Sequence, residues 1–90
     1  MDHYSLKLFV HLADTLHFGK TASACFISPS ALSRHIKRLE EEVGHRLFER
    51  DRRSVQLTPE GEIFRTYARE VLDRWRDVSN RLNEASGSLQ

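Results

Sequence analysis

The stretch from Ser28 to Arg38 carries cationic and hydroxyl side chains and no acidic ones. Arg34, Lys37 and Arg38 supply its positive charges. A guanidinium presents a fork of donors that fits the edge of guanine or clamps a phosphate, whereas an ammonium is a point charge suited to phosphate. Serine hydroxyls can donate to, or accept from, bases and phosphates. The stretch therefore predicts a surface that binds nucleic acid, formed by Pro29, Ser30, Ser33, Arg34 and Lys37.

Two other places add to this surface. Lys20 and Thr21 stand near the start of a predicted short helix at 19–25, whose amides would help to anchor a phosphate. Arg52 and Arg53 lie at the tip of a predicted hairpin, from which they would reach a minor groove or its phosphates. The complete set of expected DNA-binding residues is Lys20, Thr21, Pro29, Ser30, Ser33, Arg34, Lys37, Arg52 and Arg53.

Each of these side chains has an ordinary alternative, because an exposed arginine or serine on a helix is usually only solvated. The group as a whole is harder to dismiss, since its face carries no acid before Glu40. Residues 28–58 hold seven Lys/Arg against five Asp/Glu, whereas residues 59–90 hold five against six. The formal net charge of +1 thus conceals a positive region in mid-chain, as expected of a protein with one anion-binding face.

Catalytic and metal chemistry find little support in the sequence. The five histidines include no His-x-x-x-His pair, and there is neither a cysteine cluster nor a glycine-rich phosphate loop. The single cysteine, Cys25, falls on the apolar face of its helix and is expected to be an inert core thiol. We therefore expect no enzymatic activity, no catalytic residue, no metal and no cofactor.

Length and composition favour one small domain. The chain has 90 residues, of which 39% are hydrophobic, enough for one modest core. No apolar run approaches the length of a membrane span, and the start lacks a signal-peptide pattern. A single cysteine allows no internal disulfide, which fits a reducing compartment. A cytoplasmic protein without a membrane partner is the expectation.

The elements that must position the basic surface follow from hydrophobic spacing. Apolar residues at helical intervals predict a first helix at 3–16, begun by Asp2 or Ser5, and the short second helix at 19–25. Ser28-Pro29 is a strong helix start, and Gly44 is placed to end a third helix at 29–43. Two short segments at 47–50 and 54–57 predict a two-stranded hairpin, or wing, around a charged tip.

Thr58-Pro59-Glu60 begins a long final helix, expected at 59–85, before a tail or hinge at 86–90. Its apolar residues alternate in steps of four and three, which is a heptad seam typical of helix pairing. The same residues could instead cover the domain's own core, but that core is small and the helix would extend past it. We therefore expect a homodimer interface made by Phe64, Ala68, Val71, Trp75, Val78 and Leu82.

The run from Phe18 to Gly61 closely resembles the DNA-binding domain of LysR-type transcriptional regulators. The matching pieces include Ser28-Pro29-Ser30-Ala31-Leu32-Ser33-Arg34, Arg38-Leu39-Glu40-Glu41-Glu42-Val43-Gly44, Leu47-Phe48-Glu49-Arg50 and Leu57-Thr58-Pro59-Glu60-Gly61. Within the family, His17-Phe18-Gly19, Ser28-Pro29-Ser30 and Arg50-Asp51 are most similar to members that activate isoleucine–valine biosynthesis.

The resemblance implies a mainly α fold: a winged helix-turn-helix at 1–58 with a three-helix core, followed by a linker helix that pairs in a dimer. It also implies that the helix at about 29–43 enters the major groove of an interrupted inverted repeat, with the wing at about 47–57 at the flanking minor groove. Family members touch DNA at the positions of Pro29, Ser30, Ser33, Arg34 and Arg53. Many have glutamine in place of Pro29 and His35, so the preferred half-site is expected to differ.

Family members are about three times this length and carry a C-terminal effector-binding domain, which is absent here. The resemblance therefore implies a small-molecule effector, a tetramer and contact with RNA polymerase only for a longer protein. The alternative function is a winged-helix module that binds another protein. The acid-free stretch and the paired wing arginines favour nucleic acid, because a protein-docking face would expose more aromatic residues.

Overall fold

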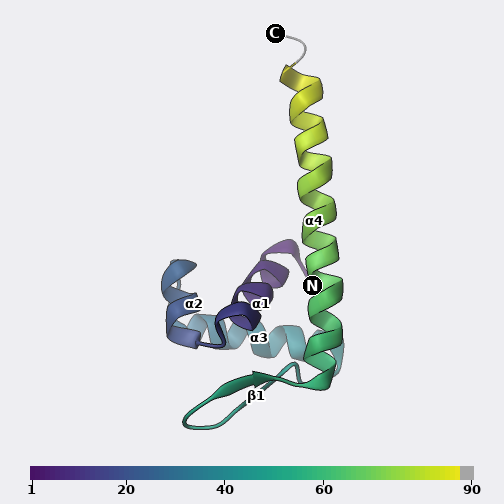
Figure 1. The fold of residues 1–90 in the computed structure, drawn as a ribbon. Coiled ribbons are helices and arrows are strands. Elements are labelled where there is room, and N and C mark those ends of the chain that lie inside the picture. Colours follow the sequence, from purple (N-terminus) through teal and green to yellow (C-terminus); the bar gives the residue numbers. More distant parts are fainter. Residues whose placement is uncertain (88–90) are drawn as a thin grey trace.

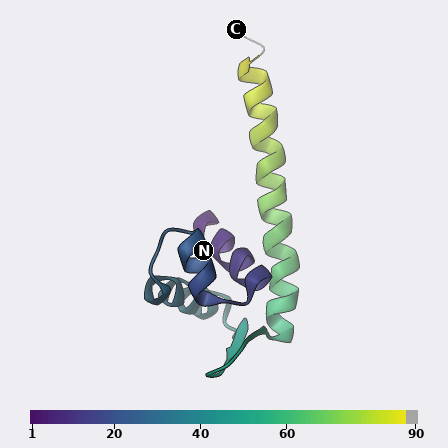
Figure 2. The same ribbon diagram turned by 60° about the vertical axis from the view of Figure 1, so that its left-hand side comes forward.

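The computed structural model describes residues 1–87 and shows a helical body from which one long helix projects (Figures 1 and 2). The molecule measures 54 × 26 × 19 Å because that helix continues past the body. In chain order the elements are α1 (His3–Thr15), α2 (Phe18–Ala24), α3 (Pro29–Val43), β1 (Phe48–Arg50), β2 (Val55–Leu57) and α4 (Pro59–Gly87). The expected mainly α fold with a two-stranded wing is confirmed, and most element ends agree within one residue.

Local sequence chemistry sets the helix ends. Asp2, rather than Ser5, caps α1, with its carboxylate 2.8 Å from the amide of Ser5. The hydroxyl of Ser28 accepts from the amide of Ala31, so the Ser28-Pro29 start of α3 is confirmed. Gly44 ends α3 with φ of 82°, a left-handed conformation that favours glycine.

The core lies where α1, α3 and the start of α4 meet. Phe9 is fully buried there, with its ring 5.3 Å from that of Phe48 and 5.1 Å from that of Phe64. Leu32, Ile36 and Leu39 line the buried side of α3. Since three successive turns of α3 are anchored in this way, its opposite side is held outward.

The wing consists of β1, β2 and the tip at 51–54. The strands pair antiparallel, with Phe48 opposite Leu57 and Arg50 opposite Val55. Thr58 then joins the wing to α4, since its buried hydroxyl donates to the carbonyl of Arg46 at 2.6 Å and accepts from the amide of Gly61 at 2.9 Å. A single residue thus caps α4 and fixes the base of the wing.

Helix α4 lies on the body along its first half and projects beyond it along its second (Figures 1 and 2). Ala68 is 0% exposed and belongs to the domain's own core, whereas Phe64 packs on Phe9 and stays half-buried. The expectation that Ala68 lies in a dimer interface is therefore corrected, because heptad spacing does not reveal which chain a seam packs against, and the other expected interface residues stay a prediction. Ser86 and Gly87 continue the helix, and the rest of the expected tail lies outside the described residues.

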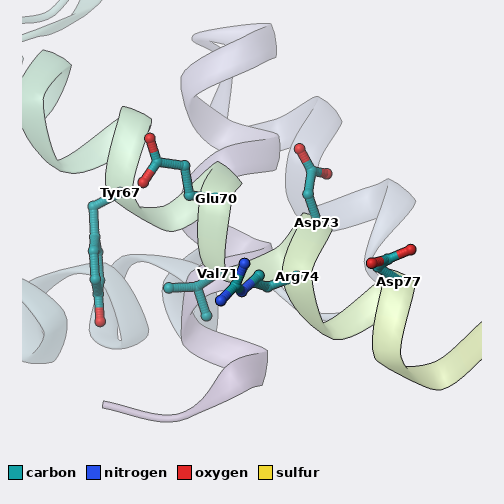
Figure 3. A pocket seen from close by; sticks show the side chains of 6 residues that line it. All are labelled: Tyr67, Glu70, Val71, Asp73, Arg74 and Asp77. Carbon is teal, nitrogen blue, oxygen red and sulfur yellow. The ribbon is translucent and has the colours of Figure 1, made fainter. Parts of the chain in front are cut away.

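The outer side of α4 has its own pattern of charge and apolar surface. A shallow hollow along this helix is lined by Tyr67, Glu70, Val71, Asp73, Arg74 and Asp77 (Figure 3). Tyr67, Val71 and Arg74 lie together, whereas Glu70 and Asp73 point to the opposite side. This part of α4 therefore combines apolar contacts with charges of both signs.

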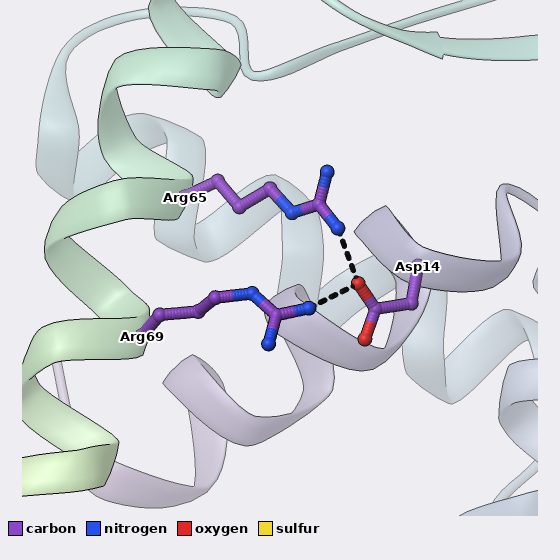
Figure 4. A network of polar contacts seen from close by, with 3 residues as sticks. All are labelled: Asp14, Arg65 and Arg69. Carbon is purple, nitrogen blue, oxygen red and sulfur yellow. Dashed lines mark hydrogen bonds and ion pairs between the residues drawn. The ribbon is translucent and has the colours of Figure 1, made fainter.

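An ion-pair cluster ties α4 to the body. Asp14, near the end of α1, accepts from Arg65 at 2.5 Å and from Arg69 at 2.6 Å, with both bonds meeting at one carboxylate oxygen (Figure 4). The two arginines are one helical turn apart on α4. Asp14 thereby helps to set the direction in which α4 leaves the body.

Candidate nucleic-acid interface

The outward side of α3 is the centre of the candidate interface. Pro29, Ser30, Arg34 and Lys37 are exposed and Ser33 is half-buried, so five expected DNA-binding residues share one accessible surface. The hydroxyl groups of Ser28 and Ser30 lie 3.1 Å apart at the first turn of the helix. No acidic side chain interrupts the surface before Glu40. The arrangement presents short polar groups at the helix start and cations further along.

Of the two α2 residues expected to bind DNA, only one has a solvent-exposed side chain. Lys20 is exposed, and its amide is held by the imidazole Nδ1 of His17 at 3.0 Å. Thr21 is 0% exposed, and its hydroxyl lies 2.6 Å from that of Thr15. The expectation that the Thr21 side chain contacts DNA is therefore corrected: it forms a part-buried hydrogen bond between α2 and Thr15 at the end of α1.

The tip of the wing is an ordered turn built on Asp51. Its Oδ1 accepts from the amides of Arg53 at 2.7 Å and Ser54 at 2.9 Å, and the amide of Asp51 donates to the carbonyl of Ser54. The hydrogen bond from the Arg53 amide, followed by that from Ser54, lowers the pKa of Asp51 below its usual value. The turn leaves the side chains of Arg52 and Arg53 exposed.

Two residues that the sequence analysis did not select hold the wing against α3. Glu40 accepts from the amide of Leu47 at 2.7 Å and from that of Phe48 at 3.2 Å through one carboxylate oxygen. Arg50 donates from Nη2 to the hydroxyl of Ser33 at 3.0 Å, and its guanidinium lies over the ring of Phe18. The reading surface of α3 and the wing thus form one connected unit.

Neither role had a clear signal in the sequence. Both residues lie in segments that resemble the family, but apart from that Glu40 stood out only as the first acid after a basic run and Arg50 only as part of a predicted strand. Their partners lie at least seven and seventeen residues away in the chain, so only the folded arrangement identifies them.

The structure also bears on metal binding, on membrane insertion and on the single cysteine. Within residues 1–87 no group of three or more His, Cys, Asp or Glu side chains is placed to hold a metal ion. No helix in the same range is both long and apolar enough to cross a membrane. Cys25 is half-buried against the core.

Comparison with known proteins identifies the family. Residues 4–62 match the family described as bacterial regulatory helix-turn-helix protein, lysR family, which covers more than half of the chain. The chain belongs to the lysR family. The matched region extends from α1 to the first turn of α4 and includes the whole surface described above.

Named relatives of this family match almost the entire chain. The HTH-type transcriptional activator IlvY of Salmonella typhimurium is 46% identical over 89 residues, which is 99% of this chain and 30% of the relative. The HTH-type transcriptional regulator IlvY of Escherichia coli is 45% identical over the same length. The chain thus spans about 30% of these relatives. These relatives are named as transcriptional regulators, which are not enzymes.

Solved lysR-family structures have the same fold. The DNA-binding domain of BenM, determined in a complex with catB site 1 DNA, matches with a TM-score of 0.91 and 35% identity over 96% of both chains. The DNA-binding domain of CbnR, also in a DNA complex, has a TM-score of 0.89 and 28% identity, covering 96% of this chain and 99% of that one. Full-length OxyR from Pseudomonas aeruginosa has a TM-score of 0.85 and 38% identity, with 94% of this chain and 28% of OxyR covered.

Proposed function

We propose that this chain is the sequence-specific DNA-binding domain of a bacterial transcriptional regulator and binds an interrupted inverted repeat as a homodimer. The observation that carries the proposal is the exposed, acid-free first half of α3, which is anchored by three buried residues on its other side. A helix held in this way can enter a major groove without moving relative to the body. The BenM and CbnR domains that share the fold were determined with DNA.

Each exposed residue has a role that suits its chemistry. Arg34 recognises a guanine edge through two parallel hydrogen bonds, or clamps a phosphate next to it. Ser30 and Ser33 hydrogen-bond to bases or phosphates, and Pro29 contacts a thymine methyl group. Lys37, farther from the helix start, binds backbone phosphate.

The flanking residues bind the DNA backbone on either side of α3. Lys20 on α2 contacts a phosphate beside the major groove. Arg52 and Arg53 at the wing tip reach the adjacent minor groove. Because Glu40 and Arg50 tie the wing to α3, the two grooves are engaged at a fixed separation.

Homodimer formation is supported by the exposed apolar residues of α4. Trp75, Val78 and Leu82 are 49%, 43% and 58% exposed, and Ile63 and Tyr67 add further apolar surface. Such a stripe on one helix is more than a small monomer usually leaves in water. We therefore infer an interface that retains Phe64, Val71, Trp75, Val78 and Leu82, includes Ile63 and Tyr67, and omits Ala68.

The charges on the same helix suit pairing with a second copy. Arg74 lies beside Tyr67 and Val71, and Asp77 lies within one turn of it (Figure 3). A two-fold interface brings each surface against its own copy, so a face with both signs of charge can be complementary to itself. The two-fold axis would place two copies of α3 on two half-sites, which predicts an inverted repeat.

The wider role belongs to a longer protein. This chain matches 30% of the length of IlvY, and by that similarity we propose that the longer protein regulates amino-acid biosynthesis. A C-terminal domain of that longer protein would bind the small-molecule effector and mediate any tetramer or RNA polymerase contact. DNA as the ligand places the protein in the bacterial cytoplasm.

Binding measurements with matched variants test the proposal. A fluorescent duplex with a lysR-type inverted repeat, a scrambled duplex and a single half-site are titrated with the chain over a range of salt concentrations. We expect at least tenfold preference for the repeat, a steep fall in affinity with salt, and loss of preference in Arg34→Ala but not in Arg76→Ala on α4. Equal binding of Arg34→Ala and wild type would contradict the proposed reading surface.

Sedimentation equilibrium tests the dimer separately. Val78 lies in the second half of α4 and is 43% exposed, so Val78→Glu should leave the body folded and shift the chain toward monomer. The same variant should bind a half-site as wild type does but lose the preference for the full repeat. A Val78→Glu variant that remains dimeric would contradict the inferred interface.

A further inference from the structure

Arg50 joins three elements of the proposed DNA-binding surface. It is the last residue of β1, where it pairs with Val55 across the wing. Its guanidinium carbon lies 4.6 Å from the centre of the Phe18 ring at the start of α2. Its Nη2 lies 3.0 Å from the hydroxyl oxygen of Ser33 on α3. The cation–π contact and the hydrogen bond together fix where the guanidinium sits.

The hydrogen bond has one direction only. A guanidinium has five N–H donors and no acceptor, so the hydroxyl oxygen of Ser33 must accept from Arg50. The single hydroxyl proton of Ser33 is therefore left for another partner. The oxygen keeps one further lone pair, but the positive charge of Arg50 beside it favours donation of the proton to an acceptor over acceptance from a second donor.

Ser33 lies in a position where this direction matters. It is half-buried on the outward side of α3, one turn after Ser30 and one turn before Lys37. Ser30 differs from Ser33 in that its described partner is the hydroxyl of Ser28, and either oxygen of that pair can be the donor. Ser33 is therefore the serine of this surface whose hydrogen-bonding direction is set by a cation.

We propose that Arg50 is a specificity-determining positioning residue that biases Ser33 toward donating a hydrogen bond to DNA, so that Ser33 favours a base with a major-groove acceptor over cytosine. In the major groove guanine, adenine and thymine each present an acceptor, whereas cytosine presents only the N4 donor. To pair with cytosine, Ser33 would have to accept a second hydrogen bond through its remaining lone pair, next to the positive charge of Arg50, and leave its own proton without a base acceptor. This inference rests on the proposed function, since it specifies one contact made by α3.

The alternative role for Arg50 is a phosphate contact or a purely structural one. Either would change affinity for all DNA sequences by a similar factor, because phosphate contacts carry no direct sequence information. The proposed role instead changes the preference at one position of each half-site. The two are distinguished by a readout resolved by base position.

Selection from a library of duplexes with randomised half-sites provides that readout. Wild type, Arg50→Met, Ser33→Ala and the double variant are compared, with Arg52→Met as the control on the wing tip. Arg50→Met keeps an unbranched side chain over Phe18 but has no donor for Ser33. Circular dichroism and thermal melting confirm that each variant is folded.

We expect wild type to disfavour cytosine at one position by roughly two- to tenfold, which corresponds to one hydrogen bond. In Arg50→Met and Ser33→Ala the discrimination at that position should fall below about twofold, and the double variant should be no worse than either alone. Arg52→Met should weaken binding without changing the discrimination against cytosine at that position. Coupling confined to one position would support Arg50 acting through Ser33.

Other outcomes would overturn the inference in distinguishable ways. An unchanged base profile in Arg50→Met, or weakening that is uniform over all positions, would reject the positioning role while the proposed function stands. If Arg50→Met does not fold, Ser33→Ala decides: retained cytosine discrimination would reject the inference. If wild type enriches no sequence at all, the proposed function fails and the inference fails with it.

Discussion

Glu40 anchors the base of the wing to α3 through one carboxylate oxygen. That oxygen accepts from the amides of Leu47 at 2.7 Å and Phe48 at 3.2 Å. The side chains of Leu47 and Phe48 are buried, with exposed fractions of 0% and 3%. Glu40→Ala removes the acceptor and leaves two amide donors in a region with little water.

The size of the effect follows from these contacts. A hydrogen bond to a charged group contributes about 1.5–3 kcal/mol, and a buried amide without a partner costs about 1–3 kcal/mol. Glu40 is half-buried, so water can replace part of the loss. We expect the free energy of unfolding to fall by about 2–3 kcal/mol, a large share of the roughly 5–15 kcal/mol typical of a domain. The corresponding fall in Tm is roughly 10–20 °C.

Urea denaturation and DNA titration measure the two consequences. Glu41→Ala is the matched control because Glu41 is the exposed neighbour of Glu40 on α3. Both variants remove one negative charge near the proposed DNA surface, which by itself favours binding. Glu41→Ala should therefore keep its stability and bind DNA at least as tightly as wild type, whereas Glu40→Ala should lose both stability and affinity. Equal behaviour of the two variants would refute the assigned role of Glu40.

Three further predictions concern the contact of α4 with the wing, the ion pairs between α1 and α4, and the turn at the wing tip. Gly61→Ala should destabilise the fold by about 1–3 kcal/mol or more, because an added Cβ would lie 2.1 Å from the carbonyl oxygen of Leu47 and 2.9 Å from Leu57. Urea denaturation measures this loss, and Gly87→Ala is the control. It should be neutral or stabilising, because nothing lies close to Gly87. Asp14→Asn should cost only about 0.2–1 kcal/mol per ion pair, because the side chains of Asp14, Arg65 and Arg69 are all more than a third exposed. Binding to duplexes with altered spacing should nevertheless show that the variant tolerates a wider range of spacer lengths in the inverted repeat. An unchanged spacer preference would contradict a role of Asp14 in directing α4. Because the pKa of Asp51 is lowered, its stabilisation of the wing-tip turn is fully present above the usual pKa of 3.8 and is lost as pH falls through the lowered value. The amide protons of Arg53 and Ser54 should therefore exchange with solvent faster in that acidic range. Protection that does not depend on pH would argue against the turn.

Local signals accounted for much of the fold. The start and end of α3 were predicted to the residue, since Ser28-Pro29 and Gly44 act within one turn of the chain. The strands of the wing were also placed to within one residue, from alternation and a charged tip. These features depend on residues close together in sequence, where capping and turn chemistry are decisive.

The errors arose where tertiary packing decides. Thr21 is a polar residue of a type that is usually exposed, but its side chain is buried because the hydroxyl of Thr15 gives it a hydrogen-bond partner. Ala68 shares a heptad seam with Leu82, yet the body covers one and leaves the other exposed. The contact of Arg50 with Ser33 spans seventeen residues and has no local pattern.

Dimethyl sulfate footprinting shows which groove α3 occupies, because the reagent methylates guanine N7 in the major groove and adenine N3 in the minor groove. We predict protection of guanine N7 within both half-sites and of adenine N3 at their flanks. Arg34→Ala should remove the first and Arg53→Ala the second. Adenine N3 protection inside the half-sites without guanine N7 protection, at concentrations that saturate binding, would contradict the placement of α3 in the major groove.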